Sequence, residues 1–144
     1  MLKVVLVDDE PSVLEGLRIF ADWEQAGFEI VGEAPDGDSS VPIIRDLHPD
    51  LVVCDIRMPG LNGLELIERI GADVARPPKF IILSGHNVFS YAQKALRLGA
   101  LGYLTKPIDP DELKRELKRA AGVIESERRG ERENLELIRY AANR

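Results

Sequence analysis

Short apolar runs alternate with amphipathic segments along most of the chain. The runs are rich in β-branched residues and almost free of polar ones, which is typical of strands covered on both faces. Gly, Pro and Asp mark the joints between the segments. The predicted strands cover residues 3–7, 28–31, 51–54, 80–83 and 101–104, and the predicted helices cover 11–21, 39–47, 64–70, 88–98 and a stretch that begins near residue 111.

Five such strand–helix repeats predict an α/β domain with a doubly wound parallel sheet, because right-handed crossovers place helices on both faces. The last helix is predicted to be unusually long. After its core-facing stripe comes a polar stretch over residues 125–130, and apolar residues then resume. Gly122 and Gly130 weaken a coiled coil here, so a connecting or dimerising helix and a frayed tail both stay open. The stripe consists of Leu113, Leu117, Ala120, Ala121 and Ile124, and the later residues are Leu135, Leu137, Ile138 and Ala141.

Composition narrows the class of protein. The 144 residues allow one ordinary domain, and 44% hydrophobic with 31% charged residues is typical of a globular protein. Cys54 is the single cysteine, so an intramolecular disulfide is excluded; we expect it to pack in the core. No run is long enough for a signal peptide or a membrane span, and we expect a cytoplasmic protein. With a net charge of −6, and with tail arginines interleaved with glutamates, we expect no direct binding to nucleic acid or membrane.

Polar residues gather where the predicted strands end. The first strand is followed by Asp8, Asp9 and Glu10, and the third by Asp55. Ser84 follows the fourth strand, and Lys106-Pro107 follow the fifth. Ligands of open parallel sheets bind outside the carboxyl ends of the strands, so these side chains are expected to face one crevice.

This set of residues suits phosphoryl transfer. Asp8 or Asp9, together with Asp55, offers the oxygen ligands that Mg²⁺ prefers. The Lys106 ammonium and the Ser84 hydroxyl would stabilise charge on phosphoryl oxygens. Asp55 is the acid at the end of the central strand, and we choose it as the nucleophile that forms an acyl phosphate.

Ordinary structural roles compete with this interpretation. Asp9 or Glu10 could cap the helix that follows, and Ser84 and Lys106 could be a cap and a turn residue. The coincidence favours the functional interpretation, because four separate junctions each end in a residue type that the same reaction needs.

Four of these stretches together resemble the receiver domain of two-component response regulators, over residues 1–124. They are residues 5–10 (VLVDDE), 50–63 (DLVVCDIRMPGLNG), 83–85 (LSG) and 102–107 (GYLTKP). The resemblance implies a flavodoxin-like fold with strand order 2-1-3-4-5 and five helices. It also implies a signalling domain that is not an enzyme, apart from catalysing its own phosphorylation and dephosphorylation.

The resemblance implies a role for each acidic residue of the site. A sensor histidine kinase would transfer a phosphoryl group to Asp55. The Mg²⁺ cofactor would be held by Asp8, Asp9, Asp55 and the backbone carbonyl of Arg57. Lys106 would contact the phosphoryl oxygens.

Further positions match residues that set the response of the family. Ser84 and Tyr103 match the switch pair, in which the hydroxyl moves to the phosphoryl group and the aromatic ring turns inward. Arg57 and His86 lie two residues after Asp55 and Ser84, where side chains flank the water that attacks the phosphoryl group. Neither is a carboxylate or an amide, which predicts slow loss of phosphate.

A narrower resemblance concerns the output. Residues 22–24 (DWE), 83–86 (LSGH) and 91–95 (YAQKA) are similar to regulators in which the receiver precedes an AraC-type DNA-binding domain. Residues 125–144 would then be a helical linker or extension toward an effector absent from this chain. We expect the readout surface around Val88, Tyr91, Tyr103 and Glu112, on the fourth helix, the fifth strand and the fifth helix. A homodimer would use either that surface or the extended last helix.

Three other classes of protein remain as alternatives. Mg²⁺-dependent phosphatases with an aspartyl nucleophile place a second aspartate two residues later, where this chain has Arg57. Flavin- or nucleotide-binding domains want a Gly- or Ser/Thr-rich phosphate loop after the first strand, where this chain is acidic. A receiver-like interaction module that never takes phosphate is the third.

Overall fold

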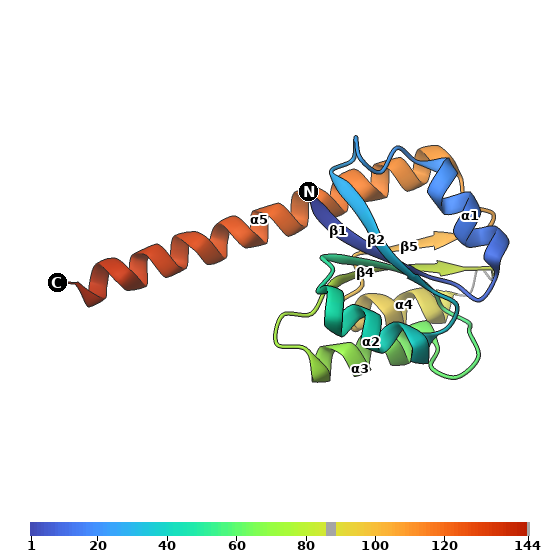
Figure 1. The fold of residues 1–144 in the computed structure, drawn as a ribbon, viewed down its shortest axis with the longest axis horizontal. Helices are drawn as coiled ribbons and strands as arrows, with labels where there is room; N and C mark the ends of the chain where they lie inside the picture. Colours follow the sequence, from blue (N-terminus) through green and yellow to red (C-terminus); the bar gives the residue numbers. More distant parts are fainter. Residues whose placement is uncertain (86–88, 144) are drawn as a thin grey trace.

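The carboxyl ends of five parallel strands lie along one edge of the sheet in this computed structural model, which describes residues 1–85 and 89–143. The strand order is β2-β1-β3-β4-β5, as the resemblance implied (Figure 1). The strands are β1 (Leu2–Val7), β2 (Phe28–Ala34), β3 (Leu51–Asp55), β4 (Lys79–Ser84) and β5 (Gly102–Thr105). The helices are α1 (Pro11–Phe20), α2 (Gly37–Leu47), α3 (Gly63–Asp73), α4 (Phe89–Arg97) and α5 (Pro110–Ala142).

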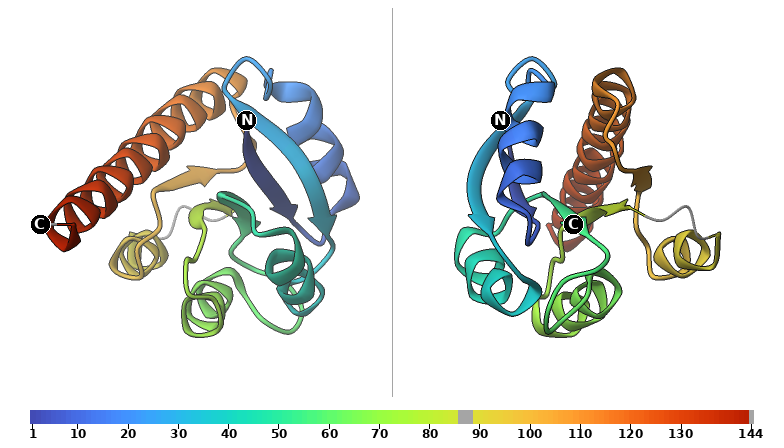
Figure 2. Two further views of the ribbon diagram at one scale, coloured as in Figure 1. Left: turned by 60° about the vertical axis from the view of Figure 1, so that its left-hand side comes forward. Right: turned by 90° about the vertical axis from the view of Figure 1, so that its right-hand side faces the viewer.

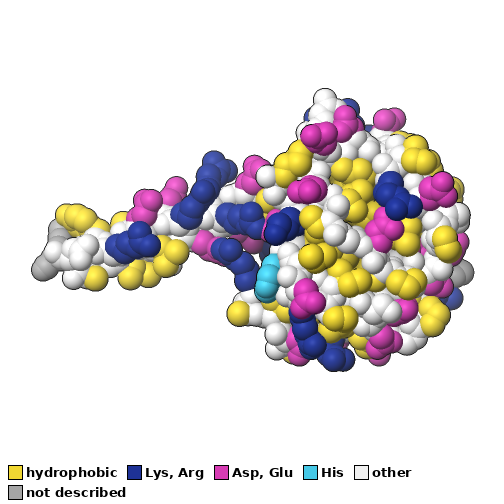
Figure 3. All heavy atoms as spheres, viewed as in Figure 1, with side chains coloured by type: hydrophobic (Ala, Val, Ile, Leu, Met, Phe, Trp, Pro, Cys, Tyr) yellow, Lys and Arg dark blue, Asp and Glu magenta, His cyan; other side chains and the backbone are white. Residues whose placement is uncertain are grey.

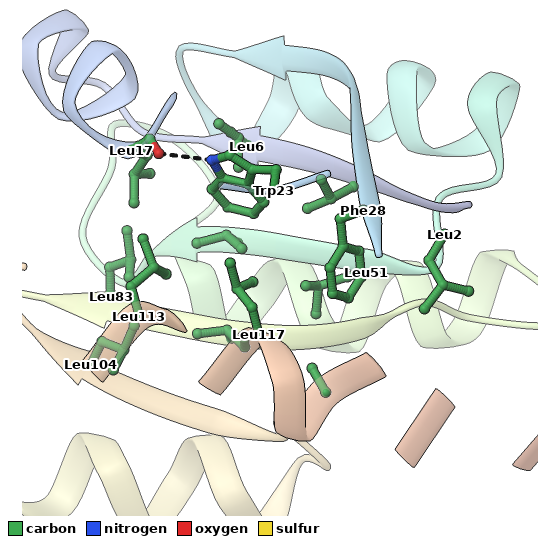
Figure 4. Packing of buried hydrophobic residues seen from close by; sticks show 14 of the residues in the cluster. Leu2, Leu6, Leu17, Trp23, Phe28, Leu51, Leu83, Leu104, Leu113 and Leu117 are labelled. Atoms are coloured by element: carbon green, nitrogen blue, oxygen red, sulfur yellow. Dashed lines mark hydrogen bonds between the residues drawn. The ribbon is translucent and has the colours of Figure 1, made fainter. Parts of the chain in front are cut away.

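Alternate residues of each strand feed two apolar clusters, one on either face of the sheet. Val4 and Leu6 pack with α1 and α5, whereas Val5 and Val7 pack with α2, α3 and α4. The two helical layers are visible in Figure 2. In the first cluster the indole of Trp23 donates a hydrogen bond to the Leu17 carbonyl over 2.8 Å (Figure 4). The predicted doubly wound architecture is therefore confirmed.

Among the strands, the boundaries differ most at the edge strand, and among the helices at α3, which continues from the predicted end at residue 70 to Asp73. The apolar run ends at Val31, yet β2 continues to Ala34, because its last three residues pair with Val5, Leu6 and Val7 of β1. Most of β2 is half-buried, as expected for an edge strand, so an apolar run alone underestimates its length.

The alternative in which the Asp9 or Glu10 side chain caps the first helix is not what the structure shows for Glu10. Glu10 is the N-cap of α1, but its side chain makes no capping hydrogen bond. The carboxylate of Asp8 instead accepts the Glu10 backbone N–H over 2.9 Å, one residue before the helix. The acidic run is therefore held by its own turn, and its carboxylates face the carboxyl edge of the sheet.

Cys54 is confirmed as a buried residue, and burial raises the pKa of its thiol well above the ordinary value.

Helix α5 is a single rod of 33 residues that runs through both glycines. Leu113, Leu117, Ala120 and Ile124 are buried as predicted, and the helix then projects from the body (Figure 1). Three ion pairs hold its emerging part against loops at the start of β3 and β4: Lys79–Glu127 at 3.0 Å, Arg76–Glu131 and Arg128–Asp50. The frayed tail is therefore not what the structure shows. Within the described part of the chain, no helix has the length and apolar character needed to cross a membrane.

Candidate functional site

The predicted site residues come together at the carboxyl edge of the sheet. Asp55 and Ser84 are the last residues of β3 and β4, Asp8 directly follows β1, and Lys106 directly follows the final residue of β5. Asp8 and Ser84 are fully buried, and Asp55 is only 4% exposed. The parallel topology therefore places an ionisable or hydroxyl side chain at the end of each inner strand and of β5.

Lys106 lies at the centre of the acidic residues. Its ammonium donates a hydrogen bond to Asp55 Oδ2 over 3.1 Å and lies 2.9 Å from Asp8 Oδ2 and 3.5 Å from a Glu10 carboxylate oxygen. Burial alone would lower the pKa of Lys106, but its close contacts with the carboxylates of Asp8 and Asp55, and their negative charges, outweigh burial and raise the pKa. Lys106 is therefore a cation that neutralises two buried carboxylates.

Asp8 remains under-satisfied despite this ion pair. Its Oδ2 lies close to the ammonium without the geometry of a hydrogen bond, and it is buried with no hydrogen-bond partner among the described residues. Burial, with the charge of Asp55 added, raises the pKa of Asp8 above its ordinary value, although the Glu10 N–H and Lys106 act in the opposite direction. An aimed, buried and incompletely satisfied carboxylate oxygen is what a cation ligand needs.

The acidic side chains are close enough to bind a single cation. One carboxylate oxygen from each of Asp8, Asp9, Glu10 and Asp55 can be chosen so that all lie within 4.8 Å of one another. Oxygen ligands in such a group fit Mg²⁺, which keeps several waters when bound to proteins. Glu10 was not among the predicted ligands, although its place in the Asp8-Asp9-Glu10 run was the signal that could have included it.

The two switch positions lie on neighbouring strands. Ser84 pairs in register with Thr105, and its carbonyl accepts the Lys106 backbone N–H over 2.7 Å, which ties the ends of β4 and β5 together. Tyr103 is half-buried and packs against the apolar cluster on the α2–α4 side. The peptide bond between Lys106 and Pro107 is cis.

Of the two positions expected to flank the attacking water, Arg57 lies within the described residues. The exposed Arg57 side chain reaches α4, where it donates to the Tyr91 hydroxyl over 3.1 Å, with its guanidinium carbon 5.5 Å from the ring centroid. Its backbone N–H donates to Asp55 Oδ1 over 3.3 Å. His86 and Val88 lie outside the described residues.

Comparison with known proteins agrees with this geometry. The sequence profile of the response regulator receiver domain matches residues 4–118. The transcriptional regulatory protein YesN of Bacillus subtilis is 37% identical over 113 residues, which are 78% of this chain and 30% of YesN. BtsR of Escherichia coli, also a transcriptional regulatory protein, is 39% identical over 119 residues, 83% of this chain and 48% of BtsR. The chain thus spans less than half the length of either relative.

A solved structure shows the same fold. The receiver domain of AraT, a response regulator from Geobacillus stearothermophilus, superposes with a TM-score of 0.81 at 33% identity, covering 88% of this chain and 98% of that one. With the family profile matching residues 4–118, this chain belongs to the response regulator receiver family of two-component systems.

Proposed function

We propose that this domain receives a phosphoryl group on Asp55 from a sensor histidine kinase, in a Mg²⁺-dependent reaction. One observation carries the proposal: the Lys106 ammonium lies between the carboxylates of Asp55 and Asp8, at 3.1 and 2.9 Å, and both carboxylates belong to a group of four acidic side chains. The carboxyl edge of the sheet thus carries the proposed nucleophile, a fixed cation and oxygen ligands for a metal.

The reaction requires little covalent chemistry from the protein. A carboxylate oxygen of Asp55 attacks the phosphorus of a phosphohistidine, an O–P bond forms and the P–N bond breaks. The electron pair of the broken bond stays on the imidazole nitrogen, which takes up a proton. Catalysis then rests on position and charge.

Each residue of the chain has a part in that positioning. Asp8, Asp9 and Asp55, with the Arg57 backbone carbonyl, would hold Mg²⁺, which neutralises the phosphoryl oxygens when bound. Lys106 neutralises the attacking carboxylate now and a phosphoryl oxygen afterwards. The Ser84 hydroxyl would donate to another phosphoryl oxygen, and Tyr103 would follow it inward, which biases the α4–β5–α5 surface.

The experiment that tests the proposal is the intact mass of the protein after incubation with Mg²⁺ and a small acyl phosphate. A single phosphoryl adduct is expected, absent from Asp55→Asn and absent with chelator. No adduct in the wild type would favour a phosphate-independent interaction module. Turnover of the donor without an adduct would favour a phosphatase.

We also propose that the phosphoryl group is lost slowly. Arg57 and His86 flank the site in the family pattern, and the Arg57 guanidinium is engaged by Tyr91. Neither side chain has the carboxylate or amide that orients an attacking water. Arg57→Asn is expected to speed the decay of the adduct in a mass time course, with Arg97→Asn on α4 as the control. An unchanged decay rate would count against this role of Arg57.

The output of the domain is proposed to be transcriptional. YesN and BtsR are named as transcriptional regulatory proteins, and this chain matches only part of each. Residues 1–124 would be the receiver, and residues 125–144 the helical linker toward an effector such as an AraC-type DNA-binding domain. The chain itself, at net charge −6, would not bind DNA. A cytoplasmic location follows from the proposal, since the kinase draws its phosphoryl group from ATP.

A homodimer through the projecting part of α5 is a further element of the proposal. Leu135, Leu137, Ile138 and Tyr140 are 56–67% exposed there, and Figure 3 shows apolar side chains along that rod. A projecting helix of this length gains stability when a partner covers its apolar face. Leu135→Arg with Ile138→Arg is expected to lower the mass in sedimentation equilibrium. If Leu96→Arg on α4 lowers the molar mass instead, the dimer uses the α4–β5–α5 surface. A wild type that sediments as a monomer excludes both dimer interfaces.

A further inference from the structure

The loop between β3 and α3, residues 56–62, contains Arg57, whose carbonyl is proposed as a metal ligand. Both ends of this loop are fixed. The Ile56 N–H donates to the Leu83 carbonyl over 2.8 Å, and the Gly63 N–H donates to the Ile56 carbonyl over 2.9 Å. Asn62 and Glu65 form a capping box at the start of α3. Between these ends, Met58 is buried in the cluster on the α2–α4 side and the Arg57 N–H donates to Asp55, whereas residues 59–60 are exposed.

Asp38, in the first turn of α2, contacts that middle part. Its Oδ2 accepts the Leu61 backbone N–H over 3.2 Å. Asp38 is exposed, and Asp36, the N-cap of α2, already accepts from Ser39 in its place. The structure therefore gives the Asp38 carboxylate no capping duty in its own helix.

Two glycines allow the close approach of α2 to the loop. Gly60 has φ +75°, and a Cβ at this position would lie 2.0 Å from Asp38 Oδ2. A Cβ at Gly37 would lie 2.3 Å from the Leu61 carbonyl oxygen. Glycine at both positions leaves room for the carboxylate and for the helix end, so the contact is built by three separate positions of the sequence.

We propose that Asp38 is a positioning residue for the phosphoacceptor site: it fixes the loop that carries Arg57, and thereby sets the affinity of the site for Mg²⁺. The proposal rests on the proposed function. Asp38 does not touch the acidic group itself; it acts through the backbone of residues 57–61. A carboxylate acceptor for a backbone N–H is worth more than a neutral one, and here it holds the exposed part of the loop that follows the buried Met58.

The primary test is the dissociation constant for Mg²⁺, measured by titration calorimetry. Asp38→Ala is expected to weaken binding by about tenfold, which corresponds to the lower end of the range for a hydrogen bond to a charged group. Asp38→Asn retains an acceptor oxygen and is expected to restore most of the affinity. The control is Asp46→Ala, which removes the same charge from the exposed surface of the same helix.

A second measurement reports on the loop without any metal. Amide hydrogen exchange of Leu61 in metal-free protein is expected to quicken by about tenfold in Asp38→Ala, while the Gly63 amide, bonded to Ile56, stays protected.

The outcomes separate this inference from the function beneath it. If Asp38→Ala quickens the exchange of the Leu61 amide but leaves the Mg²⁺ affinity unchanged, Asp38 stabilises the loop without affecting the metal site, and the inference is overturned. Wild-type protein that fails to bind Mg²⁺ would overturn the proposed function, and this inference with it. Wild-type binding with an affinity lost equally in Asp46→Ala would show a general charge effect and also overturn the inference.

Discussion

Lys106→Met is expected to slow phosphorylation of Asp55 by about 10²–10³-fold, the usual cost of removing one preorganised group that stabilises transition-state charge. The ammonium already lies 3.1 Å from Asp55 Oδ2, so it needs no reorganisation to reach an adjacent phosphoryl oxygen. The measurement is the rate of adduct formation by intact mass at saturating Mg²⁺. The control is Lys114→Met, an exposed lysine of α5 that makes no ion pair with another described residue.

The same substitution is expected to destabilise the metal-free fold. Asp8 and Asp55, with side chains 0% and 6% exposed, would lose their common cation, and breaking a buried ion pair by removing one partner costs on the order of 3 kcal/mol. Mg²⁺ should restore part of this loss, because it brings positive charge to the same oxygens. A Lys106→Met protein that is fully folded in Mg²⁺ and still phosphorylated at the wild-type rate would remove Lys106 from the mechanism.

Asp8→Asn is expected to raise stability and abolish most of the Mg²⁺ response. In the wild type, Mg²⁺ at a hundred times its dissociation constant should add about 2.7 kcal/mol to the free energy of unfolding. The variant lacks the buried carboxylate ligand and should gain far less at the same concentration. In chelator, the variant should be more stable than the wild type at pH 7, because it no longer buries an ionised oxygen with no hydrogen-bond partner.

The pH dependence of Asp8→Asn follows from the raised pKa of Asp8. The folded protein binds a proton at Asp8 at a pH where the unfolded chain, with its ordinary value of 3.8, does not. The wild type therefore recovers stability at Asp8 as pH falls through the folded pKa, and the advantage of the variant shrinks over that range. Urea unfolding at several pH values, with Asp46→Asn as an exposed control, measures it. A variant less stable than wild type at pH 7 would mean that the Lys106 ion pair outweighs burial.

The shared location of the site residues could be predicted from the sequence, because parallel topology brings the ends of separate strands together. Once the runs ending at Val7, Cys54, Leu83 and Leu104 are taken as parallel strands, the polar residues just after them must share an edge. The structure places Asp8, Asp55, Ser84 and Lys106 there. What the pattern could not predict was the exact contact of Lys106 with both carboxylates, since side-chain geometry follows from packing.

The errors of prediction have identifiable physical causes. Residues 32–34 pair with β1 through backbone groups, which leave no apolar signature on a half-buried edge strand. The alternative of a side-chain cap on α1 from Asp9 or Glu10 left out Asp8, whose carboxylate accepts the Glu10 N–H just outside the helix. The sequence carries no signal for the contact of Asp38, because an exposed acid in a first helical turn is ordinary and its partner, Leu61, lies 23 residues away in sequence.

The length of α5 would amplify small movements of the domain. Its 33 residues span about 50 Å, and only the first part of it is embedded in the core. A rearrangement beneath Leu113 and Leu117 that tilted the helix would move its far tip in proportion to the distance of the tip from the embedded part. The ion pairs of Glu127, Arg128 and Glu131 attach the helix to the domain where it leaves the core. A displacement too small to alter the core could thus become large at the place where an effector would be attached.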